Sequence, residues 1–132
     1  EVSRYASLVS AYPEVRAYLL EMQRQLAREH SVIMDGRDIG TVVLPKATVK
    51  IFLTATPEVR AKRRTDELIA KGQKADYNKI LKDIQQRDYQ DTHREIAPLK
   101  MARDSVKLDT SELDIDGVIA AMKEIIARKV TL

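Results

Sequence analysis

Two acidic side chains and an arginine stand within four residues of one another, directly after a short apolar run. The run Ser31–Asp35 leads into Arg37 and Asp38, in a segment that also contains two glycines. The guanidinium of Arg37 could bind a phosphate through two parallel hydrogen bonds, and Asp38 could accept hydrogen bonds from an amine or hydroxyl of a ligand. Asp35 could hold water around Mg²⁺. The same residues also fit a structural turn closed by a local ion pair.

A second group of charged residues lies on a helix predicted from Asp76 to about His93. Residues three and four apart share one face of a helix, and here that face is apolar at its start and charged at its end: Tyr77, Ile80, Ile84, Arg87, Asp91 and Arg94. This pattern predicts a helix that leaves the core and enters a polar cleft. There, Arg87 and Arg94 would bind phosphate and Asp91 would orient an arginine or contact the ligand. The alternative is a solvated helix end with an Arg87–Asp91 surface pair, which contributes about 0.3–0.5 kcal/mol.

Basic residues gather in a third segment, which carries Arg60, Lys62, Arg63, Arg64, Lys71 and Lys74. A basic helix that ends at a glycine, here Gly72, and is followed by a return helix resembles a mobile lid over phosphate groups. We therefore expect a helical lid over about residues 56–95. The alternative is a solvated helix face with no ligand.

Helical and strand patterns alternate along the chain. Helices are predicted near the start of the chain, at 13–29, at 57–71, at 76–93 and from Asp114 onward, and strands at Ser31–Asp35, Val49–Leu53 and Val106–Leu108. The last helix should turn an apolar face to the core, made of Ile115, Val118, Ile119, Met122, Ile125 and Ile126. This alternation predicts an α/β domain with a parallel sheet. Ligands of such sheets bind beyond the carboxyl ends of the strands, where Asp35–Asp38, Thr54–Arg64 and Asp109–Ser111 lie.

The composition is that of a globular protein. The chain has 132 residues, 44% of them hydrophobic and 33% charged, which suits one domain with a real core over residues 1–132 and excludes a disordered chain. A membrane span and a secretory signal are not expected. The absence of cysteine is compatible with the cytoplasm, and the two histidines have no partner at zinc-ligand spacing.

The net charge of +3 suits an anionic ligand such as a nucleotide phosphate, although it also fits ordinary solubility charge. A nucleic-acid-binding domain is the weaker hypothesis, because one Phe, five Tyr and no Trp would make a thin stacking surface. The sequence opens on Glu1 without methionine, with an apolar helical pattern already running at Val2. We therefore expect the chain to be a fragment of a longer protein.

Four segments resemble bacterial cytidylate kinases closely, in the same order and at the same spacing: Asp35–Pro45, Val49–Ala55, Arg60–Arg64 and Gln86–Leu99. The resemblance covers essentially the whole chain. It implies a P-loop nucleoside monophosphate kinase-like fold, a three-layer α/β/α arrangement with short parallel strands, an incomplete sheet and a helical lid. It also implies transfer of the ATP γ-phosphoryl group to CMP or dCMP, with Mg²⁺ accompanying ATP.

Carried over by position, the resemblance implies a CMP-binding set of Ser7, Arg16, Arg37, Asp38, Arg87, Asp91 and Arg94. Asp38 would read the cytosine amino group, Arg16 and Arg37 would act around the base and phosphate, and Asp91 would contact the sugar. The arginines at 37, 87 and 94 would stabilise the transferred charge. The lid arginines at 60 and 64 would point toward ATP.

The sequence departs from the kinase pattern at one decisive point. A phosphate-binding loop reads Gly-x-x-x-x-Gly-Lys-[Ser/Thr], and no pair among Gly36, Gly40, Gly72 and Gly117 fits it. We therefore expect the chain alone to be inactive, whereas the complete enzyme would be a monomer. The alternative is a non-catalytic nucleotide- or anion-binding module, or a subunit completed by another chain. An open sheet edge would favour self-association of the chain alone.

Overall fold

The computed structural model describes the backbone of residues 2–130, and the side chains of these residues except Ser3 and Ser7. In this part of the chain the elements are α1 (Val2–Val9), α2 (Pro13–Glu29), the π-helix η1 (Ile39–Val43), β1 (Ile51–Thr54), α3 (Pro57–Ala70), α4 (Tyr77–His93), β2 (Val106–Asp109) and α5 (Ile115–Lys129). The predicted helices are confirmed, with ends that agree within one or two residues.

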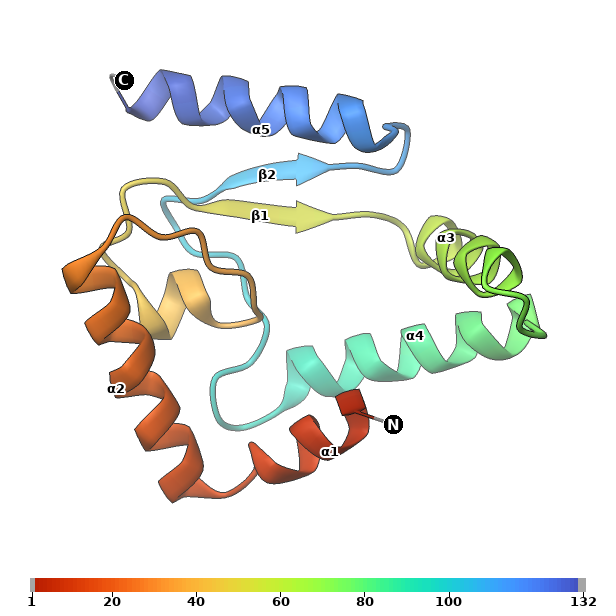
Figure 1. Cartoon of the computed structure of the whole chain (residues 1–132), viewed down its shortest axis with the longest axis horizontal. Helices are drawn as coiled ribbons and strands as arrows, with labels where there is room; N and C mark the ends of the chain where they lie inside the picture. The colour runs from red at the N-terminus through yellow and green to blue at the C-terminus, as the bar shows by residue number, and fades with distance from the viewer. Residues whose placement is uncertain (1, 131–132) are drawn as a thin grey trace.

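The two strands pair in parallel, as the alternating pattern predicts. Ile51 lies opposite Val106, and the register runs to Thr54 opposite Asp109. Parallel strands need a long crossover, and here α3 and α4 supply it. Figure 1 shows α5 running alongside β2, while α3 begins beyond the carboxyl end of β1. The chain therefore has an α/β architecture.

The strand predicted at Ser31–Asp35 is wrong. The structure has an irregular connection there, and Ile33 is 97% exposed. A strand persists only where its N–H and C=O groups find a partner strand. β1 pairs with β2 on one side, and no described residue forms a ladder with Ser31–Asp35. The predicted apolar run is real, but it has no neighbour with which to form a sheet.

Side-chain caps fix the starts of three helices at the predicted residues. Thr56 Oγ1 accepts from the Val59 N–H at 3.3 Å, ahead of Pro57 in the first turn of α3. Asp76 and Asp114 cap α4 and α5 in the same way, and Asp114 Oδ1 accepts from the Gly117 N–H at 2.7 Å. Each cap satisfies an N–H group that has no partner within the helix.

The buried core is smaller than the length of the chain predicts. The buried apolar residues of the described part are Val43, Ala55 and Ala61, and no large side chain is fully buried. On α5 the predicted core face is wrong for Ile115 and Ile119, which are exposed. The other four residues of that face are half-buried. A two-stranded sheet is too narrow to cover a whole helix face.

Polar contacts hold segments together where apolar packing is thin. Lys50 is buried, and its Nζ donates to Pro45 O at 2.5 Å and to Asp104 Oδ1 at 2.8 Å. On α2, Arg24 donates to the carbonyls of Val42 and Val43 at the end of η1. A buried cation is tolerated when it is paired and hydrogen-bonded, so Lys50 ties together the segments that precede β1 and β2.

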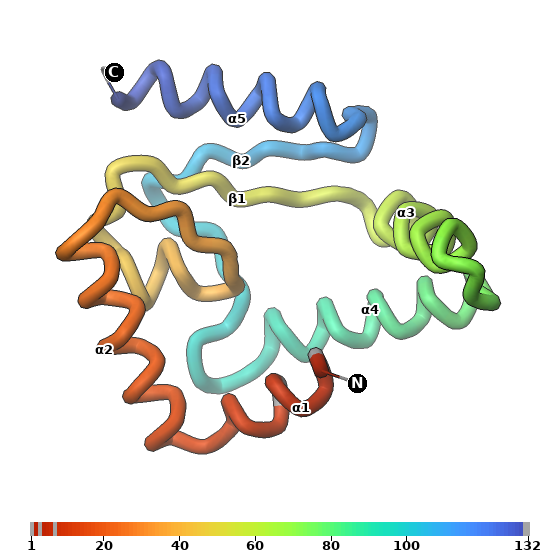
Figure 2. The backbone as a smooth tube through the Cα atoms, viewed as in Figure 1, coloured from red at the N-terminus to blue at the C-terminus, as the bar shows by residue number. Residues whose placement is uncertain are grey.

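The connection from α4 to β2 passes beside the loop that follows α2 (Figure 2), and residues of both segments line one cavity. None of the helices in the described residues combines the length and apolar character needed to cross a membrane.

A glycine with left-handed backbone ends α3 and yields a test of the fold. Gly72 has φ +74°, and no atom lies within 4 Å of where a Cβ would stand. Gly72→Ala should therefore destabilise the protein by about 1 kcal/mol through backbone strain alone, measured by urea unfolding. Gly72→Asn should lose less, because Asn adopts this conformation more readily. An alanine variant as stable as the wild type would contradict the assigned turn.

Candidate functional site

An ion pair joins the loop after α2 to the charged end of α4. Arg37 Nε donates to Asp91 Oδ2 at 2.6 Å, although the two residues are 54 positions apart in the sequence. The Asp91 side chain is 17% exposed and that of Arg37 is 40% exposed. The surface pair of Asp91 with Arg87, which the helical spacing allows, does not form. The first two candidate groups of the sequence therefore meet in one place.

A second ion pair brings α2 close to the loop that carries Arg37. Arg16 Nη2 lies 3.8 Å from Asp38 Oδ2, and both side chains are half-buried. The bonds of Arg24 to the end of η1 hold α2 against the segment that follows Asp38. A separation of 3.8 Å brings the charges together without a hydrogen bond, so both groups keep hydrogen-bonding capacity for a ligand.

The remaining arginines of α4 occupy different surroundings. Arg94 is half-buried, and its Nε donates to Ala97 O at 2.6 Å. Ala97 has φ +47°, and beyond it the Leu99 N–H donates to Asp91 O, so the chain folds back over the end of α4. This leaves the terminal nitrogens of Arg94 without a hydrogen-bond partner among the described residues. Arg87 is exposed.

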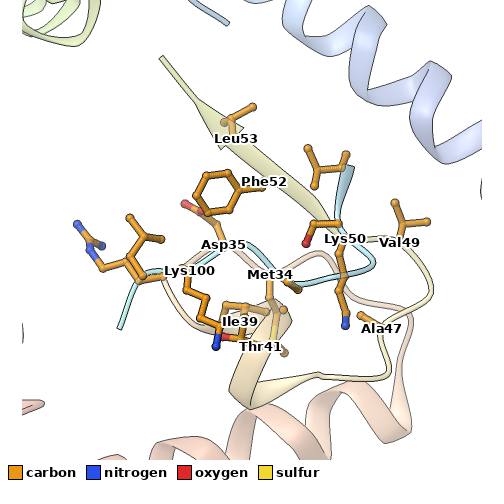
Figure 3. A pocket seen from close by; sticks show the side chains of 17 residues that line it. Met34, Asp35, Ile39, Thr41, Ala47, Val49, Lys50, Phe52, Leu53 and Lys100 are labelled. Atoms are coloured by element: carbon orange, nitrogen blue, oxygen red, sulfur yellow. The ribbon is translucent and has the colours of Figure 1, made fainter. Parts of the chain in front are cut away.

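A cavity of about 190 Å³ lies between this loop and β1, lined also by residues of the α4–β2 connection. Figure 3 shows the side chains of Asp35, Phe52 and Lys100 around it. Of the predicted site residues, Asp35 and Arg37 line this cavity. A nucleotide needs roughly 300 Å³ or more, so this space alone would not enclose one.

No three His, Cys, Asp or Glu side chains of the described residues cluster in a way that would hold a metal ion directly. Asp35 nevertheless presents a carboxylate to the cavity. A single carboxylate could contact Mg²⁺ only as part of a larger ligand set, because Mg²⁺ keeps several of its waters and takes phosphate ligands, so the indirect contact through water stays a prediction.

The two arginines predicted to belong to a lid, Arg60 and Arg64, both pair with acidic side chains. Arg60 holds both oxygens of Asp88 on α4, at 2.9 and 2.5 Å, and also donates from Nε to Ala55 O at 3.1 Å. Arg64 pairs with Glu67 at 3.0 Å on the exposed face of α3. Neither arginine therefore stands unpaired in this structure.

Two contacts near the carboxyl ends of the strands, Arg63–Thr110 and Arg60–Asp88, were not predicted from the sequence. Arg63 donates to Thr110 Oγ1 at 3.0 Å and to Thr110 O at 2.5 Å, which ties α3 to the residue after β2. Sequence reasoning did not single out Asp88, although it lies four residues after Ile84 and three before Asp91, and it treated Arg63 only as one cation of a basic run. With Leu53 and Thr92, these residues line a second cavity of about 310 Å³.

Hydrogen bonds shift the acidity of several carboxyl groups. The guanidinium of Arg60 lowers the pKa of Asp88 below its usual range, and the same contact raises the pKa of Arg60. Lys50 lowers the pKa of Asp104 through its hydrogen bond. The Ser111 hydroxyl, which donates to Asp109, lowers the pKa of that carboxyl group at the end of β2. These carboxyl groups therefore remain ionised to lower pH than free ones.

A parallel strand pair connected through helices, with arginines and carboxylates gathered beside it, defines an α/β protein. The family model for cytidylate kinase matches residues 1–128, so the chain belongs to the cytidylate kinase family. This finding confirms the resemblance stated from the sequence.

Curated relatives agree with this assignment. The chain is 51% identical over 129 residues to the cytidylate kinase of Carboxydothermus hydrogenoformans, covering 98% of this chain and 58% of the relative. It is 52% identical to that of Lactobacillus gasseri and 45% identical to that of Fervidobacterium nodosum, which it covers to 56% and 59%, with 98% of this chain aligned in each case. The chain thus spans somewhat more than half the length of these relatives.

The lowered pKa of Asp88 gives a prediction about stability and pH. A carboxylate with a lower pKa in the folded state stabilises the fold above its unfolded pKa of about 3.9, and this contribution disappears as the pH falls through the folded pKa. In urea unfolding, Asp88→Asn should be less stable than the wild type at pH 7. The difference should shrink between roughly pH 5 and pH 2.

Arg60→Gln is the matched control, because it removes the cause of the shift and keeps the carboxyl group. Its free energy of unfolding should fall less than that of the wild type as the pH is lowered, and the same should hold for Asp88→Asn. A stability difference between wild type and Asp88→Asn that stays constant from pH 7 to pH 2 would contradict the ion pair.

Proposed function

We propose that this chain is the acceptor-nucleotide part of a nucleoside monophosphate kinase that transfers the γ-phosphoryl group of ATP to CMP or dCMP. The observation that carries the proposal is the meeting of two arginines and two carboxylates from three segments, in the pairs Arg37–Asp91 and Arg16–Asp38. Membership of the cytidylate kinase family and the names of the relatives support the choice of substrate.

Within this proposal each charged group has a distinct task. Asp38 accepts a hydrogen bond from the cytosine amino group, and Asp91 accepts from a sugar hydroxyl. Arg37 and Arg94 bind the acceptor phosphate, with Arg87 closing over it from the exposed side of α4. Arg16 lies 3.8 Å from Asp38, which supports its place between base and phosphate. Ser7 completes the proposed set, but its side chain lies outside the described residues.

Transfer itself requires positioning and neutralisation of charge more than covalent help. A phosphate oxygen of CMP attacks the γ-phosphorus of ATP, the bond from that phosphorus to the β–γ bridging oxygen breaks, and ADP leaves with the bonding electrons. The arginines would stabilise the charge on the transferred group. When bound, Mg²⁺ neutralises the ATP phosphates, and Asp35 would hold one of its waters.

The proposed whole enzyme is a P-loop kinase with a three-layer α/β/α arrangement and a helical lid over residues 56–95. The two parallel strands and the α3–α4 pair are compatible with this fold. The 132 residues contain no Gly-x-x-x-x-Gly-Lys-[Ser/Thr] sequence to cradle the ATP phosphates. We therefore propose that these residues bind the acceptor nucleotide and do not transfer phosphoryl groups alone.

The same missing motif favours a second candidate, a binding module or subunit whose phosphate loop comes from another chain. The two candidates differ in what restores activity. A single longer chain is sufficient for the first, whereas the second needs a separate polypeptide.

Calorimetric titration with CMP, AMP and inorganic phosphate tests the acceptor site. CMP should bind saturably and AMP more weakly, because the larger purine ring of AMP would carry its amino group to a different position from the cytosine amino group that Asp38 would recognise. Asp38→Ala should weaken CMP binding roughly ten- to a hundredfold, since a hydrogen bond to a charged group contributes about 1.5–3 kcal/mol. Its effect on phosphate binding should be much smaller.

Asp66→Ala is the control, since it removes the same charge from the exposed Lys62–Asp66 pair on α3. Its affinity for CMP should equal that of the wild type. Equal binding of CMP and AMP, or full CMP affinity in Asp38→Ala, would refute the assigned base contact. Formation of ADP from ATP and CMP by the 132 residues would refute the proposed inactivity.

A further inference from the structure

Two aspartates three residues apart pair helix α4 with arginines of other segments. Asp91 pairs with Arg37 of the loop after α2, and Asp88 pairs with Arg60 of α3. Three residues of α-helix rise by about 4.5 Å, so any movement of α4 that displaces Asp88 also displaces Asp91. The position of the predicted acceptor site is therefore mechanically connected to the Arg60–Asp88 pair.

Arg60 is held from two directions. Two of its nitrogens meet the two oxygens of Asp88, and the third donates to the carbonyl of Ala55. Ala55 is 7% exposed and directly follows β1. A two-point guanidinium–carboxylate contact fixes orientation as well as distance. Arg60 therefore connects the end of the sheet, the first turn of α3 and the charged half of α4.

This contact differs in kind from the other ion pairs of α3. Lys62 pairs with Asp66 within the same helix, and both side chains are exposed. Such pairs contribute little and link no separate elements. Asp88 lies 28 positions from Arg60 on a different helix, and about a third of each side chain is exposed. Each of the three guanidinium nitrogens donates one hydrogen bond, so three of the five N–H groups of Arg60 are committed to this contact.

We propose that Arg60 and Asp88 are positioning residues that fix α4 against the end of β1 and so keep Asp91 within reach of Arg37. The proposal rests on the proposed function, because its consequence is the geometry of the acceptor site. It assigns Arg60 a different task from the ATP contact that the family resemblance implies, and it gives Asp88 a task that sequence reasoning missed.

The test follows the side-chain Nε–H resonance of Arg37 in ¹H–¹⁵N spectra, assigned by its loss in Arg37→Lys. A short charge-assisted hydrogen bond to Asp91 shifts this resonance and slows its exchange with water. In Asp88→Asn, which still folds by circular dichroism, the resonance should move toward that of an exposed arginine and exchange faster. In the control Asp66→Asn it should stay unchanged. A purely structural role would lower the unfolding midpoint without moving this resonance.

Arg60→Lys keeps the charge but loses the two-point contact, so it should give an intermediate shift, and it serves as the test if Asp88→Asn fails to fold. An unchanged Arg37 resonance in either folded variant overturns the proposal. The affinity for CMP, measured in parallel, should fall at least threefold in Asp88→Asn. If the wild type binds no CMP, the proposed function fails, whereas the Arg37 resonance still decides whether the pair positions α4.

Discussion

The contact between Arg37 and Asp91 is the constraint on which the site depends. It spans 54 residues and joins a loop that has no regular partner to the charged end of a long helix. The loop that carries Asp38 is also held through η1 and by the 3.8 Å approach of Arg16. Under the proposed function the same two groups are the ones that a phosphate and a sugar hydroxyl would engage, so structure and ligand would use the same charges.

Polar contacts take an unusually large part in this fold, because the buried apolar residues are few and small. Arg60, Arg63 and Lys50 each connect elements that are far apart in the sequence. A bidentate arginine fixes direction, which apolar contact alone does not. The arrangement of α3 and α4 around the ends of the strands is therefore specified more by a few arginines than by a packed interior.

The sequence predicts the elements well where local chemistry decides them. Capping residues such as Thr56 and Asp114 and the glycine at 72 set helix ends within a residue or two. The failure at Ser31–Asp35 has a different origin, since a strand depends on a neighbour that no local pattern reveals. Likewise, helical spacing places Asp91 on the correct face, but only the tertiary structure shows that its partner is Arg37 and that Arg60 is occupied by Asp88.

The most direct measurement of the central claim is a titration of the ¹⁵N-labelled chain with CMP, followed through its backbone amide resonances. If the three segments form one acceptor site, amides around Arg16, Arg37–Asp38 and Asp91–Arg94 should shift together with a single dissociation constant, while those of α5 stay in place. Shifts confined to one segment, or different constants for the three, would show that these charged groups do not act as one site.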